Sequence, residues 1–121
     1  MGRNYKMTNA EYRLADIIWD SEPVESPELC RLCEQKLGWK RTTTYTILKK
    51  LCDKGVTRND AATVTSLIKR GEAQKNESLE VTDRVFGGSL PLFVSSFLSG
   101  KRLSEEEARE LKELIDRHRE G

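Results

Sequence analysis

The segment from Trp39 to Gly55, WKRTTTYTILKKLCDKG, carries residue types that can bind nucleic acid. Small or apolar side chains recur at Thr44, Leu48 and Leu51, a spacing that predicts a helix with this side buried. Hydroxyl-bearing and basic side chains cover the other side. Short hydroxyls can reach base edges or phosphates in a DNA major groove, and ammonium groups replace the counterions of the phosphates. A helix face that is only solvated usually carries mixed Glu and Lys pairs instead.

The exposed positions of this segment and the strand after it are the candidate DNA contacts. Expected near base edges are Arg41, Thr42, Thr43, Tyr45 and Thr46; expected near phosphates are Lys49, Lys50 and Arg58. The formal net charge of the chain is only +1, yet residues 36–58 hold seven basic residues and one acidic residue. A nearly neutral protein with one concentrated basic segment fits sequence-specific recognition better than general binding of polyanions.

Two shorter helices are predicted before the basic one. Thr8–Glu11 has the capping-box pattern and opens a helix that ends near Asp20. The positions expected to be buried in it are Ala10, Leu14, Ile17 and Ile18. Ser26, as N-cap, followed by Pro27 opens a second helix, which Gly38 ends. Three short helices with tight connections, the third of them basic, predict a helix-turn-helix.

A β-hairpin is predicted directly after the basic helix. Runs rich in β-branched residues at 56–58 and 62–67 flank Asn59–Ala61, which suits a turn. Arg58, Asn59 and Asp60 would then lie near the tip of a wing. Residues 1–69 are therefore expected to form a winged helix-turn-helix domain.

Residues 70–121 predict three helices without a domain-sized core. A polar helix spans 70–86, the apolar segment Leu90–Leu98 follows, and Ser104–Glu107 is a capping box that opens the last helix. Because each helix has a single apolar stripe, we expect a helical dimerisation domain buried against a second copy. The side chains expected in that interface are Phe93, Val94, Phe97, Leu98, Leu111, Leu114 and Ile115. The fold class is thus mainly α with a small β-wing.

Other function classes find little support in the sequence. His118 is the only histidine, and the chain has neither a Gly-rich phosphate loop nor a serine-nucleophile motif, so no enzyme is predicted. No apolar run approaches the length of a bilayer span, and the first six residues lack the apolar core of a signal peptide. We therefore expect a cytoplasmic protein that does not insert into a membrane.

Cys30 and Cys33 form a C-x-x-C pattern, which can indicate zinc or redox chemistry. A structural zinc site needs four ligands; Cys52 is the only other thiol, and His118, the only histidine, lies near the C-terminus in the other predicted domain. We therefore expect the set to be incomplete within one chain and predict no metal and no cofactor. Cys33 is expected to be a small core residue. One alternative is a metal- or redox-responsive repressor that uses these two thiols. Another is an interaction module that binds no DNA, which leaves the basic Thr-rich helix unexplained.

Four segments of the chain carry distinctive motifs, and they follow one another in a defined order. They are W-x-x-T-T-x-Y-T-x-L-x-x-L-x-x-K-G at 39–55, Thr8–Glu11 followed by Ile18–Trp19, Phe86–Ser89 with the apolar helix after it, and Leu103–Glu107 with the Glu- and Leu-rich helix behind it. Together they resemble the penicillinase repressor (BlaI/MecI/CopY) family of bacterial winged-helix regulators. The resemblance extends from about Thr8 to Ile115.

The resemblance implies a homodimeric repressor on a palindromic double-stranded DNA operator, often before genes for β-lactamase or an altered penicillin-binding protein. It also implies induction through a membrane sensor metalloprotease and cleavage within the dimerisation domain, commonly at an Asn-Phe bond. The bond that matches here is Ser96–Phe97. The paired C-terminal cysteines of the copper-responsive branch have no counterpart, since no cysteine follows Cys52. The wing looks shorter than in the well-known repressors and lacks their aromatic residues.

Overall fold

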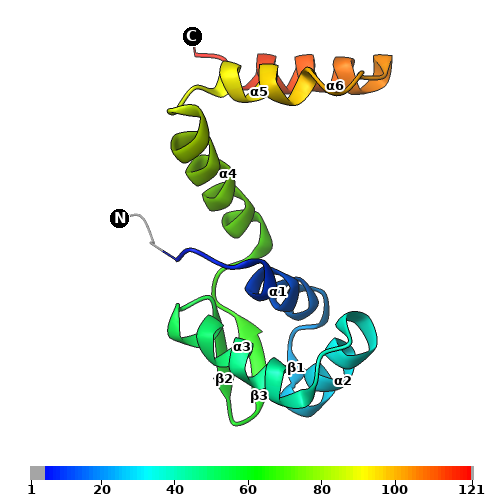
Figure 1. Cartoon of the computed structure of the whole chain (residues 1–121), viewed down its shortest axis with the longest axis vertical. Helices are drawn as coiled ribbons and strands as arrows, with labels where there is room; N and C mark the ends of the chain where they lie inside the picture. The colour runs from blue at the N-terminus through cyan, green and yellow to red at the C-terminus, as the bar shows by residue number, and fades with distance from the viewer. Residues whose placement is uncertain (1–4, 121) are drawn as a thin grey trace. The chain divides into compact units, whose positions relative to one another are not determined.

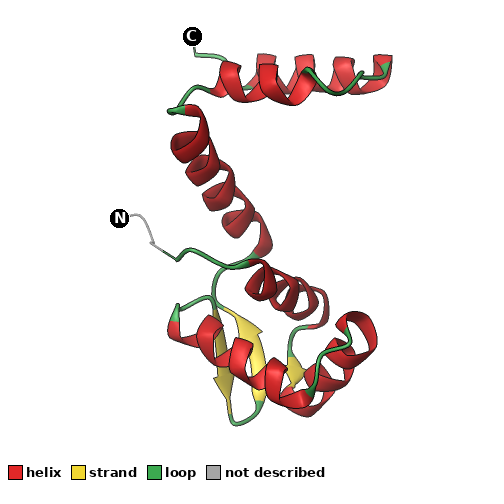
Figure 2. Cartoon of the chain, in the orientation of Figure 1, coloured by secondary structure: helices red, strands yellow, loops and turns green. Residues whose placement is uncertain are grey.

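A computed structural model describes residues 5–120 (Figures 1 and 2). Its elements are α1 (Asn9–Ser21), β1 (Val24–Glu25), α2 (Ser26–Leu37), α3 (Arg41–Asp53), β2 (Thr57–Asp60), β3 (Thr63–Ser66), α4 (Arg70–Phe86), α5 (Leu90–Leu98) and α6 (Glu105–Arg117). This architecture confirms the predicted fold class, which is mainly α with a small β-wing. Of the six N-terminal residues considered above for targeting, residues 1–4 lie outside the described range. Among residues 5–120, no helix combines the length and the apolar character that crossing a bilayer requires.

The chain divides into two compact units. The first runs to Glu77 and the second begins at Ser78, so the division falls within α4. The first turns of α4 contact α1, because the Tyr12 hydroxyl donates to the carbonyl of Ala73 at 2.9 Å. Arg70 adds an ion pair with Asp20 at 2.8 Å. The start of α4 therefore packs with the winged helix.

Helices α1, α2 and α3 and the sheet enclose the core of the first unit. Its buried side chains include Leu14, Ile17 and Ile18 from α1, Leu29 and Cys33 from α2, Leu48 and Leu51 from α3, and Val56, Val64 and Ile68 around the sheet. Three of the four positions predicted to be buried in α1 are buried; Ala10 is only half-buried. The predicted capping box is confirmed, since the Glu11 N–H donates to the Thr8 hydroxyl and the Thr8 N–H donates to the Glu11 carboxylate.

The sheet contains a strand that the sequence did not predict. The two-residue strand β1 pairs antiparallel with β3, which gives the order β1-β3-β2. Val24 lies opposite Val64, and the N–H of Ser26 donates to the carbonyl of Ala62 at 2.8 Å. Two residues are too few to show an alternating pattern, so only the edge of β3 defines this strand.

The start of α2 also differs from the prediction. Ser26 is the first helical residue and is buried, whereas Glu25 occupies the N-cap position and makes no side-chain capping hydrogen bond. Pairing of β1 with β3 places the preceding residue at the cap, and this overrides the local preference for serine there. Pro27 lies in the first turn as expected.

The turn of the wing begins two residues further along the chain than predicted and ends one residue further. Asp60 pairs with Thr63, so Asn59 and Asp60 belong to β2 and the two-residue turn is Ala61–Ala62. Both alanines have positive φ, 52° and 71°. Two-residue hairpin turns need this left-handed geometry to match the twist of their strands, although alanine disfavours it. Strand pairing therefore outweighs the turn preference of Asn59 and Asp60.

We predict that Ala62→Gly stabilises the first unit. Glycine adopts positive φ without the steric cost that alanine pays there. Relief of this cost exceeds the free-energy cost of the extra chain entropy of unfolded glycine, so the free energy of unfolding should rise by about 0.5–1 kcal/mol. The midpoint temperature of thermal unfolding should rise by about 2–8 °C for a unit of this size. Ala15→Gly, at a regular helical position of α1, should instead lower the midpoint. A lower midpoint temperature for Ala62→Gly would contradict the idea that alanine is strained at this position.

Glu22 joins the end of α1 to strand β3. Its carboxylate accepts from the Ser66 N–H at 2.7 Å and from the Ser66 hydroxyl, and the Lys69 ammonium lies 3.4 Å away. Burial alone would raise the pKa of Glu22, but these hydrogen bonds and the charge of Lys69 hold it below its usual value of 4.5. The ionised carboxylate therefore stabilises the attachment of β3.

The depressed pKa predicts a loss of stability in acid. The contribution of Glu22 is fully present above pH 4.5 and is lost as the pH falls through the lower pKa of the folded state. Chemical denaturation at pH 7 and pH 3 should show a smaller difference for Glu22→Gln than for the wild type. Glu34→Gln, an exposed change on α2, should leave the difference unaltered. Equal acid sensitivity of wild type and Glu22→Gln would disprove this contribution.

The second unit has no buried residue within the part of the chain that the structure describes. The predicted capping box of α6 is confirmed, with the Glu107 N–H donating to the Ser104 hydroxyl at 3.0 Å and the Ser104 N–H donating back at 3.3 Å. Phe86 and Phe93 contact each other, their ring centroids 5.2 Å apart. The helices of this unit are well formed individually, but a single chain does not enclose a core here.

Candidate nucleic-acid interface

Helix α3 has the two faces that its sequence predicts. Thr44, Leu48 and Leu51 are buried, at 0%, 2% and 0% exposure, and anchor the helix in the core. The helix begins at Arg41, two residues later than predicted, after Gly38 ends α2 in the left-handed conformation. Lys40 holds its N-cap position without a side-chain capping bond. The first backbone N–H groups of α3 therefore lack a side-chain acceptor, an arrangement that favours a nearby phosphate.

The structure gathers the candidate DNA contacts on the outer face of α3. Seven of the eight lie on this helix and are exposed: Arg41, Thr42, Thr43, Tyr45, Thr46, Lys49 and Lys50. The eighth, Arg58, is exposed on β2, the strand against which α3 packs (Figure 1). One continuous helical surface thus carries hydroxyls and cations, and the wing strand adds another cation.

The cations of this surface differ in how they are already paired. Lys49 lies 3.1 Å from Asp53, and Arg58 lies 3.5 Å from Asp60. Within residues 5–120, Arg41 and Lys50 make no ion pair. A cation without a partner has no competing carboxylate to leave when it meets a phosphate. Arg41 and Lys50 lie within 4 Å of no carboxylate among the described residues, although the charge of Lys50 still acts on Glu11, and they are therefore the cations of α3 most available to a polyanion.

The hydroxyls of the surface also differ. The Thr46 hydroxyl donates to the carbonyl of Thr42 at 2.9 Å, so its proton is used inside the helix and its oxygen can still accept. The Thr42 and Thr43 hydroxyls have no hydrogen-bond partner among the described residues and can both donate and accept. Tyr45, 38% exposed, donates from its phenol to the Ser26 hydroxyl at 3.4 Å.

Two contacts beside α3 were not predicted. Ser26 accepts from Tyr45, and Lys54, at the end of α3, lies 2.6 Å from the carboxylate of Glu11. Burial by itself would raise the pKa of Glu11, but hydrogen bonds from Lys54 and the Thr8 N–H, with the charges of Lys54 and Lys50, lower it below 4.5. Glu11 and Lys54 are 43 positions apart, so no local pattern signals their contact.

All three cysteines belong to the first unit, and two of them are buried in it. Cys30 and Cys33 are buried on α2, as predicted for Cys33, and burial raises the pKa of the Cys33 thiol. Cys52 is half-buried, with its sulfur 3.3 Å from the Thr57 hydroxyl. Across residues 5–120, no three His, Cys, Asp or Glu side chains are grouped so that they could hold a metal ion. A raised pKa keeps Cys33 protonated and weakly nucleophilic at neutral pH.

The predicted interface residues of the second unit are mostly exposed in one chain. The exposed ones are Val94 (42%), Phe97 (54%), Leu98 (36%), Leu111 (42%), Leu114 (45%) and Ile115 (61%). Phe93 differs, because it is half-buried against Phe86 of its own chain. Ser96, beside Phe97 in the matching cleavage bond, is also exposed.

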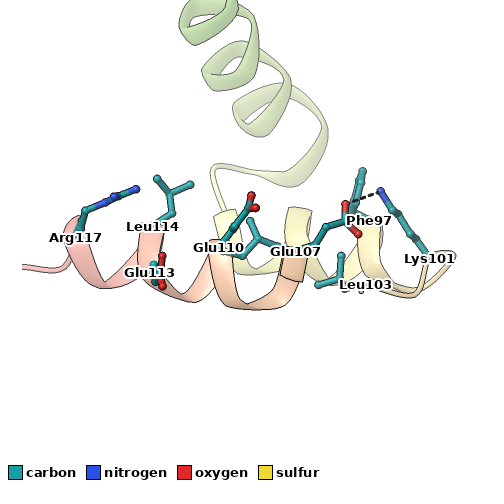
Figure 3. Close-up of a pocket in the computed structure, with 9 residues that line it drawn as sticks. Phe97, Lys101, Leu103, Glu107, Glu110, Glu113, Leu114 and Arg117 are labelled. Carbon is teal, nitrogen blue, oxygen red and sulfur yellow. Dashed lines mark ion pairs between the residues drawn. The ribbon is translucent and has the colours of Figure 1, made fainter. Parts of the chain in front are cut away.

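A hollow of about 460 Å³ lies between α5 and α6 (Figure 3). Phe97, Leu103 and Leu114 give it apolar walls, and charged side chains of α6 form its rim. Lys101 spans one end, 3.8 Å from Glu107 and over the ring of Phe97. An apolar floor with a charged rim is typical of a protein–protein contact surface.

Comparison with known proteins agrees with this architecture. The chain is 22% identical over 119 residues to the methicillin resistance regulatory protein MecI of Staphylococcus epidermidis, covering 95% of this chain and 97% of that protein. It is 24% identical over 118 residues to the penicillinase repressor of Bacillus licheniformis, covering 94% and 92% of the two chains. The family model for the penicillinase repressor matches residues 7–117. The chain therefore belongs to the penicillinase repressor family.

Proposed function

We propose that this protein is a homodimeric transcriptional repressor that binds a specific sequence of double-stranded DNA. The observation that carries the proposal is the outer face of α3, where the exposed side chains of Thr42, Thr43, Arg41 and Lys50 make no side-chain hydrogen bond or ion pair among the described residues. Such a face can place hydroxyls at base edges while the cations displace phosphate counterions. Membership of a family named for repression supports the same function.

The positions of the individual residues on α3 support a proposed role for each. Arg41, Thr42, Thr43, Tyr45 and Thr46 lie on the N-terminal half of the helix, the part that contacts bases in helix-turn-helix proteins. Lys49 and Lys50 lie further along, where a groove-bound helix approaches the backbone, and Arg58 reaches it from β2. Phosphate contacts position the protein, and base contacts give it specificity.

The dimer is supported by the apolar side chains that the second unit leaves exposed. Six of the seven predicted interface residues are at least one-third exposed in a single chain. Monomeric proteins seldom leave so many large apolar side chains of one small unit in water. A second copy of the same surface is the simplest partner, because a two-fold dimer pairs identical patches and places two α3 helices on a palindromic operator.

The genes under control are proposed from the relatives. One is named for methicillin resistance and the other for penicillinase, so we propose that the target genes confer resistance to β-lactams. In such a system a membrane sensor metalloprotease would start induction, and the repressor would be cut at Ser96–Phe97. Both residues are exposed in α5, which makes the bond reachable once the helix opens locally.

A mobility-shift experiment tests DNA binding directly. The protein is first used to select duplexes from a random-sequence pool, and the selected duplex is then bound in the presence of unselected competitor DNA. Retention of a defined complex supports a sequence-specific repressor. Failure to enrich any sequence, or loss of the complex in competitor, would leave an interaction module without DNA specificity as the better description.

We further predict that cutting the chain at residues 96–97 releases DNA. The cut separates the apolar side chains of α5 from those of α6, and affinity for a palindrome depends on joining two weak half-site contacts. A recognition sequence for a specific protease placed at this bond tests the prediction, with mass spectrometry to confirm cleavage. The same sequence placed after Arg117 should be cut without releasing DNA. Full retention of DNA after cleavage at 96–97 would exclude this route of induction.

A further inference from the structure

The C-terminal end of α3 is anchored to α1 by a contact that the proposed contacts with DNA do not use. Lys54 is the C-cap residue of α3, and its ammonium lies 2.6 Å from Oε1 of Glu11. The same ammonium donates to the carbonyl of Lys6. Glu11 is only 2% exposed, and the side chain of Lys54 is 31% exposed. The pair is therefore largely withdrawn from water, unlike the exposed pair of Lys49 with Asp53.

One carboxylate oxygen joins two structural tasks at this point. Oε1 of Glu11 accepts from the Thr8 N–H at 2.8 Å, which caps α1, and also from Lys54 at 2.6 Å. A carboxylate so deeply buried needs a cationic partner, because charge without compensation is strongly disfavoured out of water. The start of α1 and the end of α3 are consequently held in one arrangement.

We propose that Glu11 is a positioning residue for DNA recognition, acting through Lys54 to set the angle at which α3 presents its outer face. This inference rests on the function proposed above. Helix α3 has 13 residues and is about 20 Å long, so a tilt of about 5° at Lys54 moves its N-terminal end by about 1.7 Å. Hydrogen bonds to base edges do not survive a displacement of that size.

Removal of the carboxylate charge separates positioning from charge attraction. In Glu11→Gln the amide can still accept from the Thr8 N–H, so the cap of α1 is kept. The ammonium of Lys54 loses its ionic partner and becomes available to phosphates, which strengthens attraction to any DNA. A positioning role therefore predicts weaker discrimination without weaker binding to unselected DNA, a result that a general loss of folding does not produce.

The test uses the full-length dimer and two duplexes of equal length, one selected by the wild-type protein and one of mixed sequence. The measured quantity is the specificity ratio, which is the dissociation constant for the mixed duplex divided by that for the selected duplex. It is measured at a temperature where circular dichroism shows each variant folded. Glu11→Gln and Lys54→Met should lower the ratio about tenfold, the value of one weak base contact. Lys54→Arg keeps the ion pair and should therefore show the ratio of the wild-type protein. Glu28→Gln, which breaks the exposed pair with Arg31 on α2, serves as the matched control and should leave it unchanged.

Several results would overturn the proposal. An unchanged ratio in Glu11→Gln and Lys54→Met would show that the pair does not orient α3. If the ratio is unchanged while both duplexes bind more weakly, the pair contributes to stability alone. If Glu11→Gln does not fold, the comparison of Lys54→Met with Lys54→Arg decides the matter. If the wild-type protein selects no sequence, the proposed function itself fails. That result is distinguishable because it precedes any substitution.

Discussion

Phe97→Ala is expected to turn the dimer into a monomer at micromolar concentration and to weaken operator binding by orders of magnitude. The ring is 54% exposed in one chain, and Phe97 and Leu114 both line the hollow between α5 and α6. If a second copy buries it fully, truncation costs about 3–5 kcal/mol at each site. In the proposed two-fold dimer each substitution would count twice.

The loss of DNA affinity follows from the loss of linkage. Two half-site contacts made by one dimer gain about 10²–10⁴ over either contact alone, and a monomer forfeits that gain. Sedimentation equilibrium measures the association, and mobility shift on the selected duplex measures binding. Leu67→Ala, at an apolar residue of the first unit with 51% exposure, is the matched control and should leave the dimer intact. A wild-type protein that sediments as a monomer at micromolar concentration would refute the dimer interface.

Thr43→Ala is expected to relax sequence preference, whereas Lys50→Ala should weaken binding to all sequences alike. The Thr43 hydroxyl has no partner within residues 5–120, so a base edge can use both its donor and its acceptor capacity. Losing such a contact costs about 1–3 kcal/mol of discrimination at one base pair, or about 5- to 150-fold. Thr46→Ala should have the smaller effect, because its proton is already donated to Thr42.

The lysines provide the contrasting result. Lys50 has no ion pair among the described residues, so its removal should lower the slope of log K against log salt by about one unit. Lys49→Ala should change the slope less, since Asp53 already competes for its ammonium at 3.1 Å. Competition binding at several salt concentrations gives both quantities. Equal loss on selected and mixed DNA in Thr43→Ala would remove this residue from the base-contacting set.

Most helices could be predicted from the sequence because their signals are local. The capping boxes at Thr8 and Ser104 place both partners within four residues, and the structure shows both. The buried face of α3 depends on a spacing of three and four residues, which any helix imposes on its own chain. The fold class and the outer face of α3 were therefore accessible before the tertiary structure.

Other features depend on segments that lie far apart in the chain. The turn at Ala61–Ala62 and the strand β1 exist because β3 offers pairing on both of its edges, against the preferences of Asn59 and Ser26. Likewise, the sequence shows Lys54 only as one more cation of the basic segment. Packing reveals that Lys54 is committed to Glu11, 43 positions away, whereas the pair of Lys49 with Asp53 is local, four residues apart on α3.

The sequence by itself determined which segments are helical, which face of α3 is polar, and that the last helices are amphipathic. The tertiary structure decided where the wing turns, which cations stay available, and how Glu11 holds the end of α3. The physical reason is range: capping and periodicity act over a few bonds of one chain. Ion pairs and strand registers instead depend on the positions that packing gives to residues such as Glu11 and Lys54, 43 positions apart.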